Sequence, residues 1–212
     1  MQKTILFDLD GTLTDSGEGI FACTEVVLRH YGLPIPDRKD MRFMIGPPLK
    51  QSYPQFGIRQ EDLEDAIELY RQHYNAGGIY QNVPYPGISQ LLRELKQQGH
   101  KLCVATSKPE NMAHVVLEHF DLAQYFDLIC GAQEECNRSK KSDVIAYLLA
   151  QNGNRSNMIM VGDTVYDMLG AAEFGIPTIG VAWGYGNEAE MLGGGAIAIA
   201  RDPEHLLTLL NA

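Results

Sequence analysis

Short apolar runs alternate with one-sided helical patterns along most of this chain. The helical patterns place apolar residues three and four apart, as at Ile88, Leu91, Leu92 and Leu95. The apolar runs are residues 5–10, 101–107, 126–130, 157–163, 177–183 and 196–200. Because strands that alternate with helices form a parallel sheet with helices on both faces, the pattern predicts an α/β fold.

The segment between the first two runs departs from this alternation. It contains helical patterns and turn-forming residues but no clean strand pattern, and Pro84 and Pro86-Gly87 mark its end. We therefore predict an α/β core from residues 1–15 and 86–212, interrupted by a helical insertion over residues 16–85. Helices are predicted over residues 17–31, 61–74, 88–95, 110–120, 143–151, 166–175 and 204–210.

Polar side chains gather directly after three of the predicted strands and before one helix. In a parallel sheet the carboxyl ends of the strands lie at one edge, where ligands bind. The topology therefore brings together carboxylates, hydroxyls and ammonium groups that are far apart in the sequence. The residues concerned are Asp8, Asp10, Gly11, Thr12, Thr106, Ser107, Lys108, Ser139, Lys140, Lys141, Gly162, Asp163, Thr164 and Asp167. Such a set is typical of a phosphoryl-transfer site.

Asp8 and Asp10 lie so close together that their charges repel unless a cation or a proton separates them. We predict that Asp8 is the nucleophile that forms an aspartyl-phosphate. Asp10 would be the general acid and base, first for the leaving alcohol and then for water. Mg²⁺ would relieve the repulsion between carboxylate and phosphate, and the predicted metal residues are Asp8, Asp10 and Asp163.

The remaining candidates would bind the phosphoryl group or support the site. Thr106, Ser107 and Gly11 are predicted to contact phosphate through hydroxyl or backbone groups. Lys140 and Lys141 are adjacent and only one of them should reach the phosphate; we favour Lys141. Asp167 is predicted to support the metal site. The alternative role for Asp163 and Asp167, as acids at a helix N-terminus, is compatible with the first.

Composition narrows the class of partner. The chain has 212 residues, 45% of them hydrophobic, and a net charge of −10, which argues against nucleic acid or an anionic membrane as the main partner. The N-terminus has no signal-peptide pattern, and no apolar stretch approaches the ~20 residues of a membrane helix. The four cysteines form no metal or disulfide pattern, so we expect a cytoplasmic protein with reduced thiols.

These motifs resemble those of the haloacid dehalogenase superfamily of phosphohydrolases, in particular its phosphoglycolate phosphatase-like members. The resemblance rests on Asp8-x-Asp10-Gly11-Thr12, on Thr106-Ser107, on the lysine pair and on Gly162-Asp163-x-x-x-Asp167, in the family's order. It implies a Rossmann-like core, Mg²⁺ dependence, and a helical cap, residues 16–85, that closes over the active site. It also implies that Asp10 is the general acid.

The leading hypothesis is therefore an Mg²⁺-dependent phosphatase for a small phosphorylated metabolite, with phosphoglycolate and nucleoside 5'-monophosphates as candidate substrates. A phosphosugar mutase of the same superfamily is the alternative, and release of inorganic phosphate separates the two. A third hypothesis is a non-catalytic receiver that is phosphorylated on Asp8, although a receiver needs no cap. The sequence leaves the substrate and the oligomeric state open.

Overall fold

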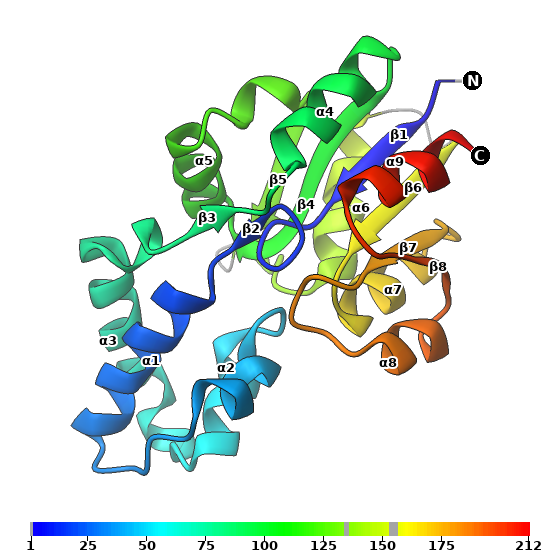
Figure 1. The fold of residues 1–212 in the computed structure, drawn as a ribbon. Coiled ribbons are helices and arrows are strands. Elements are labelled where there is room, and N and C mark those ends of the chain that lie inside the picture. The colour runs from blue at the N-terminus through cyan, green and yellow to red at the C-terminus, as the bar shows by residue number, and fades with distance from the viewer. Residues whose placement is uncertain (1, 134–135, 153–156) are drawn as a thin grey trace.

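A six-stranded parallel sheet forms the centre of the molecule, in the order β5-β4-β1-β6-β7-β8 (Figure 1). The computed structural model describes residues 2–133, 136–152 and 157–212. The strands are β1 Thr4–Phe7, β4 Lys101–Pro109, β5 Leu128–Ala132, β6 Met158–Gly162, β7 Thr178–Val181 and β8 Ala196–Ala200. This sheet confirms the α/β class and the Rossmann-like core expected from the sequence.

The two faces of the sheet bury separate apolar layers. Along β1, Ile5 and Phe7 contribute to one layer and Leu6 to the other, because successive strand side chains point to opposite faces. The layer around Ile5 includes side chains of α4 (Ile88–Gln97), α5 (Glu110–His119) and α9 (Pro203–Asn211). The layer around Leu6 includes those of α6 (Lys141–Asn152) and α7 (Val165–Ala172). The sheet is therefore covered on both sides, which explains its near-continuous apolar strands.

The helices outside the insertion lie close to their predicted positions, with shifted ends. They are α4 Ile88–Gln97, α5 Glu110–His119, α6 Lys141–Asn152, α7 Val165–Ala172, α8 Glu188–Gly193 and α9 Pro203–Asn211, with the 3-10 helix η5 Ala123–Tyr125. Two differences bear on the site. Helix α6 begins at Lys141, before the predicted 143, and β4 extends beyond 107 to Pro109. Residues 126 and 127, predicted as strand, precede β5, while α8 was not predicted.

Between β1 and α4 the chain forms mainly helices, which lie at one end of the sheet (Figure 1). They are α1 Gly17–His30, η1 Arg38–Met44, α2 Leu49–Ser52, η2 Tyr53–Phe56, η3 Gln60–Asp62, α3 Leu63–Ala76 and η4 Gly78–Tyr80. Helices α1 and α3 contact each other, and Met41, Tyr53 and Tyr74 are buried among the inserted elements. This segment corresponds to the predicted cap, whose domain boundaries remain a prediction.

A short antiparallel ribbon joins the inserted helices to the core. Its strands, β2 Thr14–Asp15 and β3 Val83–Pro84, pair Thr14 with Pro84 and Asp15 with Val83. The sequence pattern missed this ribbon, since two residues are too few to show an alternation and a proline disfavours a strand. Across the three described ranges, none of the helices is long and apolar enough to cross a membrane.

Candidate active site

Asp8 follows β1 directly and is held at the carboxyl end of the sheet. Its N–H donates to the carbonyl of Val161 on β6 at 2.9 Å, which continues the ladder beyond Phe7. The side chain is buried, and its Oδ1 accepts a hydrogen bond from the Leu9 N–H at 2.7 Å. The same oxygen lies 2.9 Å from the Nζ atom of Lys141. A buried carboxylate thus stands at the sheet edge predicted to bind ligands.

Lys141 joins several elements at this point. It is the first residue of α6, and its Nζ lies 2.7 Å from Oδ1 of Asp167 and donates to the Ala105 carbonyl at 2.9 Å. The side chain is buried, whereas Lys140 is exposed. Of the two lysines that the sequence left open, the structure therefore places Lys141 against Asp8.

Asp163 and Asp167 complete a buried acidic cluster with Asp8. Carboxylate oxygens of the three residues lie within 4.8 Å of one another. Asp163 follows β6, and its two oxygens accept hydrogen bonds from the Thr12 hydroxyl at 3.2 Å and the Tyr185 N–H at 2.8 Å. Both aspartates are fully buried. The cluster, defined as Asp8, Asp163 and Asp167, is therefore held by hydrogen bonds from segments on both sides of β1.

Asp167 also belongs to the N-terminus of α7. Thr164 is the N-cap residue, and its N–H donates to Oδ2 of Asp167 at 3.1 Å in a capping box. The predicted role of Asp167 as an acid at a helix N-terminus is thus confirmed. The N-cap residue of this helix is Thr164 and not Asp163. Because one carboxylate oxygen caps the helix and the other meets Lys141, Asp167 fixes the ammonium group beside Asp8.

The cluster carries more negative charge than its single cation balances. The pKa of Asp8 is raised to about 6, chiefly by burial; the charge of Lys141 opposes the rise, while those of Asp167 and Asp10 contribute to it. Burial also raises the pKa of Asp163 well above its usual range, and Asp167 and Asp8 add to the effect. Burial alone would lower the pKa of Lys141, but Asp167 and Asp8 raise it above its ordinary value, so the lysine is charged.

This arrangement fits a hard divalent cation. Three buried carboxylates and one ammonium leave a formal charge of about −2, and oxygen donors are the ligands that Mg²⁺ prefers. Asp8 and Asp163 would hold the ion, while Asp167, which contacts Thr164 and Lys141, would keep the ammonium group beside Asp8.

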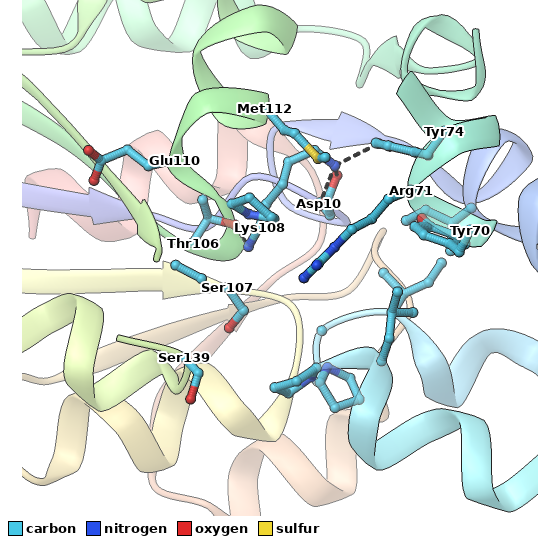
Figure 2. A pocket seen from close by; sticks show the side chains of 18 of the residues that line it. Asp10, Tyr70, Arg71, Tyr74, Thr106, Ser107, Lys108, Glu110, Met112 and Ser139 are labelled. Atoms are coloured by element: carbon cyan, nitrogen blue, oxygen red, sulfur yellow. Dashed lines mark hydrogen bonds and ion pairs between the residues drawn. The ribbon is translucent and has the colours of Figure 1, made fainter. Parts of the chain in front are cut away.

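Asp10 lines the cleft and has a different cation as its partner from the one that pairs with the cluster. Its two carboxylate oxygens accept hydrogen bonds from Nζ of Lys108 at 3.0 and 2.9 Å, and the same Nζ donates to the Tyr74 hydroxyl at 2.7 Å (Figure 2). The carboxylate of Asp10 therefore pairs with Lys108, whereas those of Asp8 and Asp167 pair with Lys141. A metal contact through Asp10, predicted from the sequence, remains a prediction.

The predicted phosphate-binding residues occupy different surroundings. Thr106 is buried, and its hydroxyl accepts the Lys108 N–H at 3.2 Å, while Ser107 lines the cleft. Gly11 has φ +85°, its N–H donates to the Thr14 carbonyl at 2.8 Å, and a Cβ there would collide with the Asp163 carboxylate. A glycine is thus required here by backbone conformation and by the close approach of Asp163.

A cleft of about 760 Å³ opens between the core and the inserted helices (Figure 2). Asp8, Asp10 and Ser107 line it from the core. The side chain of Arg71 extends into it from α3, as Figure 2 shows. The inserted segment supplies a largely apolar lining of Ile20, Met44, Ile45, Pro47, Pro48, Leu49, Ile67, Tyr70 and Tyr74. A ligand that reaches Asp8 therefore meets both parts of the molecule.

A second contact holds the inserted segment to the core beside the acidic cluster. Arg42 of η1 donates to the Gly184 carbonyl at 2.6 Å, and its guanidinium lies 5.4 Å from the centre of the Tyr185 ring. The Tyr185 hydroxyl contacts Asp15 of β2 and accepts the Gly17 N–H at 2.7 Å. Since the Tyr185 N–H binds Asp163, this loop links the cluster to the ribbon and to η1.

Comparison with known proteins agrees with this geometry. Residues 5–181 match the family described as haloacid dehalogenase-like hydrolase, which is most of the chain. The chain belongs to this family. The resemblance drawn from the sequence motifs is thereby confirmed.

The relatives within this family differ in their named activities. The chain is 42% identical to the tyrosine-protein kinase PtkA of Mycobacterium tuberculosis over 87% of its own length, but it spans only 63% of that relative. It is 39% identical to a 5'-nucleotidase of Pseudomonas aeruginosa, covering 88% of this chain and 86% of the other. A predicted phosphatase from Clostridium acetobutylicum superposes with a TM-score of 0.95 at 38% identity, over 100% of this chain and 99% of that one.

Three residues of this haloacid dehalogenase-like site have partners that were not predicted from the sequence. Lys108 was placed at the sheet edge with Thr106 and Ser107, but nothing in its position showed that it would pair with Asp10. Tyr74 and Arg42 lie in the insertion, and their partners, Lys108 and Gly184, are in the core. Only the three-dimensional structure brings these groups together, because no spacing rule links residues of separate elements.

Proposed function

We propose that this chain is an Mg²⁺-dependent phosphatase that hydrolyses a small phosphomonoester through an aspartyl-phosphate on Asp8. The observation that carries the proposal is the placement of Asp8 at the floor of the cleft, within reach of Lys141 and beside Asp163. Family membership and the superposition on a predicted phosphatase support a phosphoryl-transfer reaction.

In the first step a carboxylate oxygen of Asp8 attacks phosphorus, and the bond from phosphorus to the alcohol oxygen breaks. Asp10, two residues further on and facing the cleft, donates a proton to that oxygen. Lys141 holds the Asp8 carboxylate in place, and Thr106 and Ser107 are proposed to bind the other phosphoryl oxygens. Bound at Asp8 and Asp163, Mg²⁺ would offset the repulsion between the carboxylate and the phosphoryl oxygens.

In the second step Asp10 removes a proton from a water molecule whose oxygen attacks the same phosphorus. The bond between Asp8 and phosphorus breaks, inorganic phosphate leaves, and Asp10 is again protonated for the next cycle. The inserted helices line the cleft in which this step takes place, and their apolar side chains would limit the entry of other water molecules.

The cleft favours an organic phosphate larger than phosphoglycolate. Its volume of about 760 Å³ and its apolar lining from the inserted segment leave room for a sugar and a base beyond the phosphoryl group. The 39% identical 5'-nucleotidase supports the same choice. Nucleoside 5'-monophosphates are therefore the first proposed substrates, with phosphoglycolate as the second. The free thiols of Cys103 and Cys130 suit a cytoplasmic location.

The proposal is tested by phosphate release from a panel of phosphorylated metabolites, with Mg²⁺ and with EDTA. The panel contains nucleoside 5'-monophosphates, phosphoglycolate, sugar phosphates and pyrophosphate. We expect Mg²⁺-dependent release that is strongest with one monoester and absent in Asp8→Asn. Transfer of phosphate between sugar positions without release would establish the mutase instead. Tyrosine phosphorylation from ATP, the activity named for the mycobacterial relative, would establish a kinase.

A further inference from the structure

Lys108 makes an unusually complete set of contacts for a side chain next to the proposed chemistry. Its Nζ donates to both oxygens of Asp10, at 3.0 and 2.9 Å, and to the Tyr74 hydroxyl at 2.7 Å. An ammonium group has three donors, so these three contacts use all of them. The Asp10 carboxylate is thereby fixed by both of its oxygens (Figure 2).

The surroundings make this arrangement rigid. Lys108 is 8% exposed and Tyr74 is 2% exposed, so both side chains are largely shielded from water. The Tyr74 ring lies 4.9 Å from Nζ of Lys108 and stacks on Tyr70 of the same helix at 5.4 Å between ring centres. A buried ammonium is stable only when it is paired, and here it is paired on both sides.

The three side chains come from two parts of the molecule. Asp10 follows β1 and Lys108 lies in β4, both in the core, whereas Tyr74 lies in α3 of the inserted segment. The hydrogen bond from Lys108 to Tyr74 therefore joins the core to the insertion. It is made by the same ammonium group that binds Asp10, the proposed acid and base. It forms only when α3 lies over the carboxyl end of the sheet.

We propose that Lys108 and Tyr74 are positioning residues that hold the Asp10 carboxylate on the leaving-group side of the cleft, and that Tyr74 makes this placement depend on the seating of α3. The inference rests on the proposed phosphatase function. Misplacing a catalytic group by about 1 Å can cost about 10²-fold in rate. Loss of either contact should therefore impair the step in which Asp10 protonates the leaving oxygen, while Asp8 and its neighbours remain in place.

A comparison of leaving groups tests this placement. An alkyl phosphate such as a nucleoside monophosphate needs a proton on its leaving oxygen, whereas p-nitrophenyl phosphate releases a stable anion without one. Single-turnover rates of alcohol and nitrophenolate release are measured for wild type, Lys108→Met, Lys108→Arg and Tyr74→Phe. We expect alkyl release to fall by about 10- to 100-fold in Lys108→Met and less in Tyr74→Phe and Lys108→Arg, with the nitrophenolate burst within about twofold of wild type.

Lys96→Met provides the matched control. Lys96 makes the same two-oxygen contact with Asp127, at 3.0 and 2.9 Å, on the surface away from the cleft, so its removal should leave both rates unchanged. Melting temperatures of all variants are recorded, and Tyr74→Phe preserves the ring and its packing if Lys108→Met unfolds.

Equal loss with both substrates, or a rise in KM alone, would overturn the inference and assign Lys108 to folding or to substrate binding. Failure of wild type to release phosphate from either substrate would instead reject the phosphatase function on which the inference rests.

Discussion

Two aspartates separated by one residue are placed in different surroundings. Asp8 is buried beside Lys141 in the acidic cluster, while Asp10 is partly exposed to the cleft and paired with Lys108. Unlike surroundings are what allow paired carboxylates to act as nucleophile and as acid within one site. The chemical difference between the two residues is therefore a property of their neighbours and not of their residue type.

Substitution separates the two roles. We expect Asp8→Asn to abolish both turnover and the phospho-enzyme, because no carboxylate oxygen remains to attack phosphorus. Asp10→Asn should lower the turnover rate by about 10²–10⁴-fold while Mg²⁺ binding largely survives, because the proposed role of this residue is proton transfer. Phosphate release and acid-quenched phospho-enzyme report the two effects, and calorimetric titration reports metal binding. Near wild-type turnover in both variants would contradict the mechanism.

At the scale of single residues, the sequence predicted which polar side chains lie at the carboxyl ends of the strands. Asp8, Thr106 and Asp163 could be assigned to one sheet edge because strand order alone delivers them there. The direction of each side chain could not be predicted. The spacing of Asp8 and Asp10 in the sequence does not show which cation each carboxylate will meet. Tertiary packing brings Lys108 against Asp10.

Helix α7 shows how one element supports the site. Thr164 and Asp167 form its capping box, and the same Asp167 carboxylate holds Lys141. Thr164→Ala should lower the free energy of unfolding by about 1 kcal/mol, as loss of an N-cap hydroxyl typically does, and should also reduce turnover. Asn187→Ala removes the N-cap of α8, whose side chain accepts the N–H groups of Ala189 and Glu190.

Chemical denaturation and phosphate release distinguish the two caps. The Asn187→Ala variant should lose a similar amount of stability, about 1 kcal/mol, with turnover retained, because α8 carries none of the cluster residues. Equal losses of turnover in both variants would show that Thr164 acts only through global stability.

Element η1 of the inserted segment is held against the loop that follows β7 in the core. Arg42 donates to Gly184 and lies over the Tyr185 ring. Arg42→Gln removes a hydrogen bond and a cation–π contact, together worth about 1–2 kcal/mol, so amide hydrogen exchange in η1 should rise by about five- to thirtyfold. Arg59→Gln, which removes surface pairs with Glu61 at 2.8 Å and Asp62 at 2.7 Å, is the control. Unchanged exchange in η1 would show that other contacts hold it.

The strongly periodic elements were predictable and the short ones were not. The pattern of Ile88, Leu91, Leu92 and Leu95 predicted α4, and all four residues are buried. The ribbon of β2 and β3 escaped prediction because its pairing joins residues about 70 positions apart, Thr14 with Pro84, through only two residues on each strand. At the start of α6 the Asp143 carboxylate accepts the N–H groups of Ser139 and Lys140, a contact that the apolar pattern does not show.

For the whole molecule, the acidic cluster predicts that metal and stability are linked. The repulsion among Asp8, Asp163 and Asp167 destabilises the metal-free protein, and an ion bound only by the folded state stabilises it. Mg²⁺ at about 100 times its Kd should add about 2.7 kcal/mol and raise the Tm by roughly 5–10 °C, which EDTA reverses.

Asp163→Asn should change both sides of this linkage. It removes a buried charge while an amide can still accept from Tyr185 and donate to Thr12, so the metal-free Tm should rise by about 2–4 °C. The Mg²⁺-dependent increase should disappear. Thermal melts of wild type and variant, each with and without Mg²⁺, measure both effects. A lower metal-free Tm would show that the carboxylate stabilises the fold by itself.

The pairing of β2 with β3 also has a consequence for how such a protein can diversify. Because Asp15 and Val83 lie opposite each other, the inserted segment leaves and re-enters the core through neighbouring residues. An insert of another length or fold could be joined at the same two points without moving Asp8, Lys141 or Asp163, which belong to the core. The ribbon is thus a junction at which the inserted side of the cleft could be exchanged as a unit while the core side is inherited unchanged.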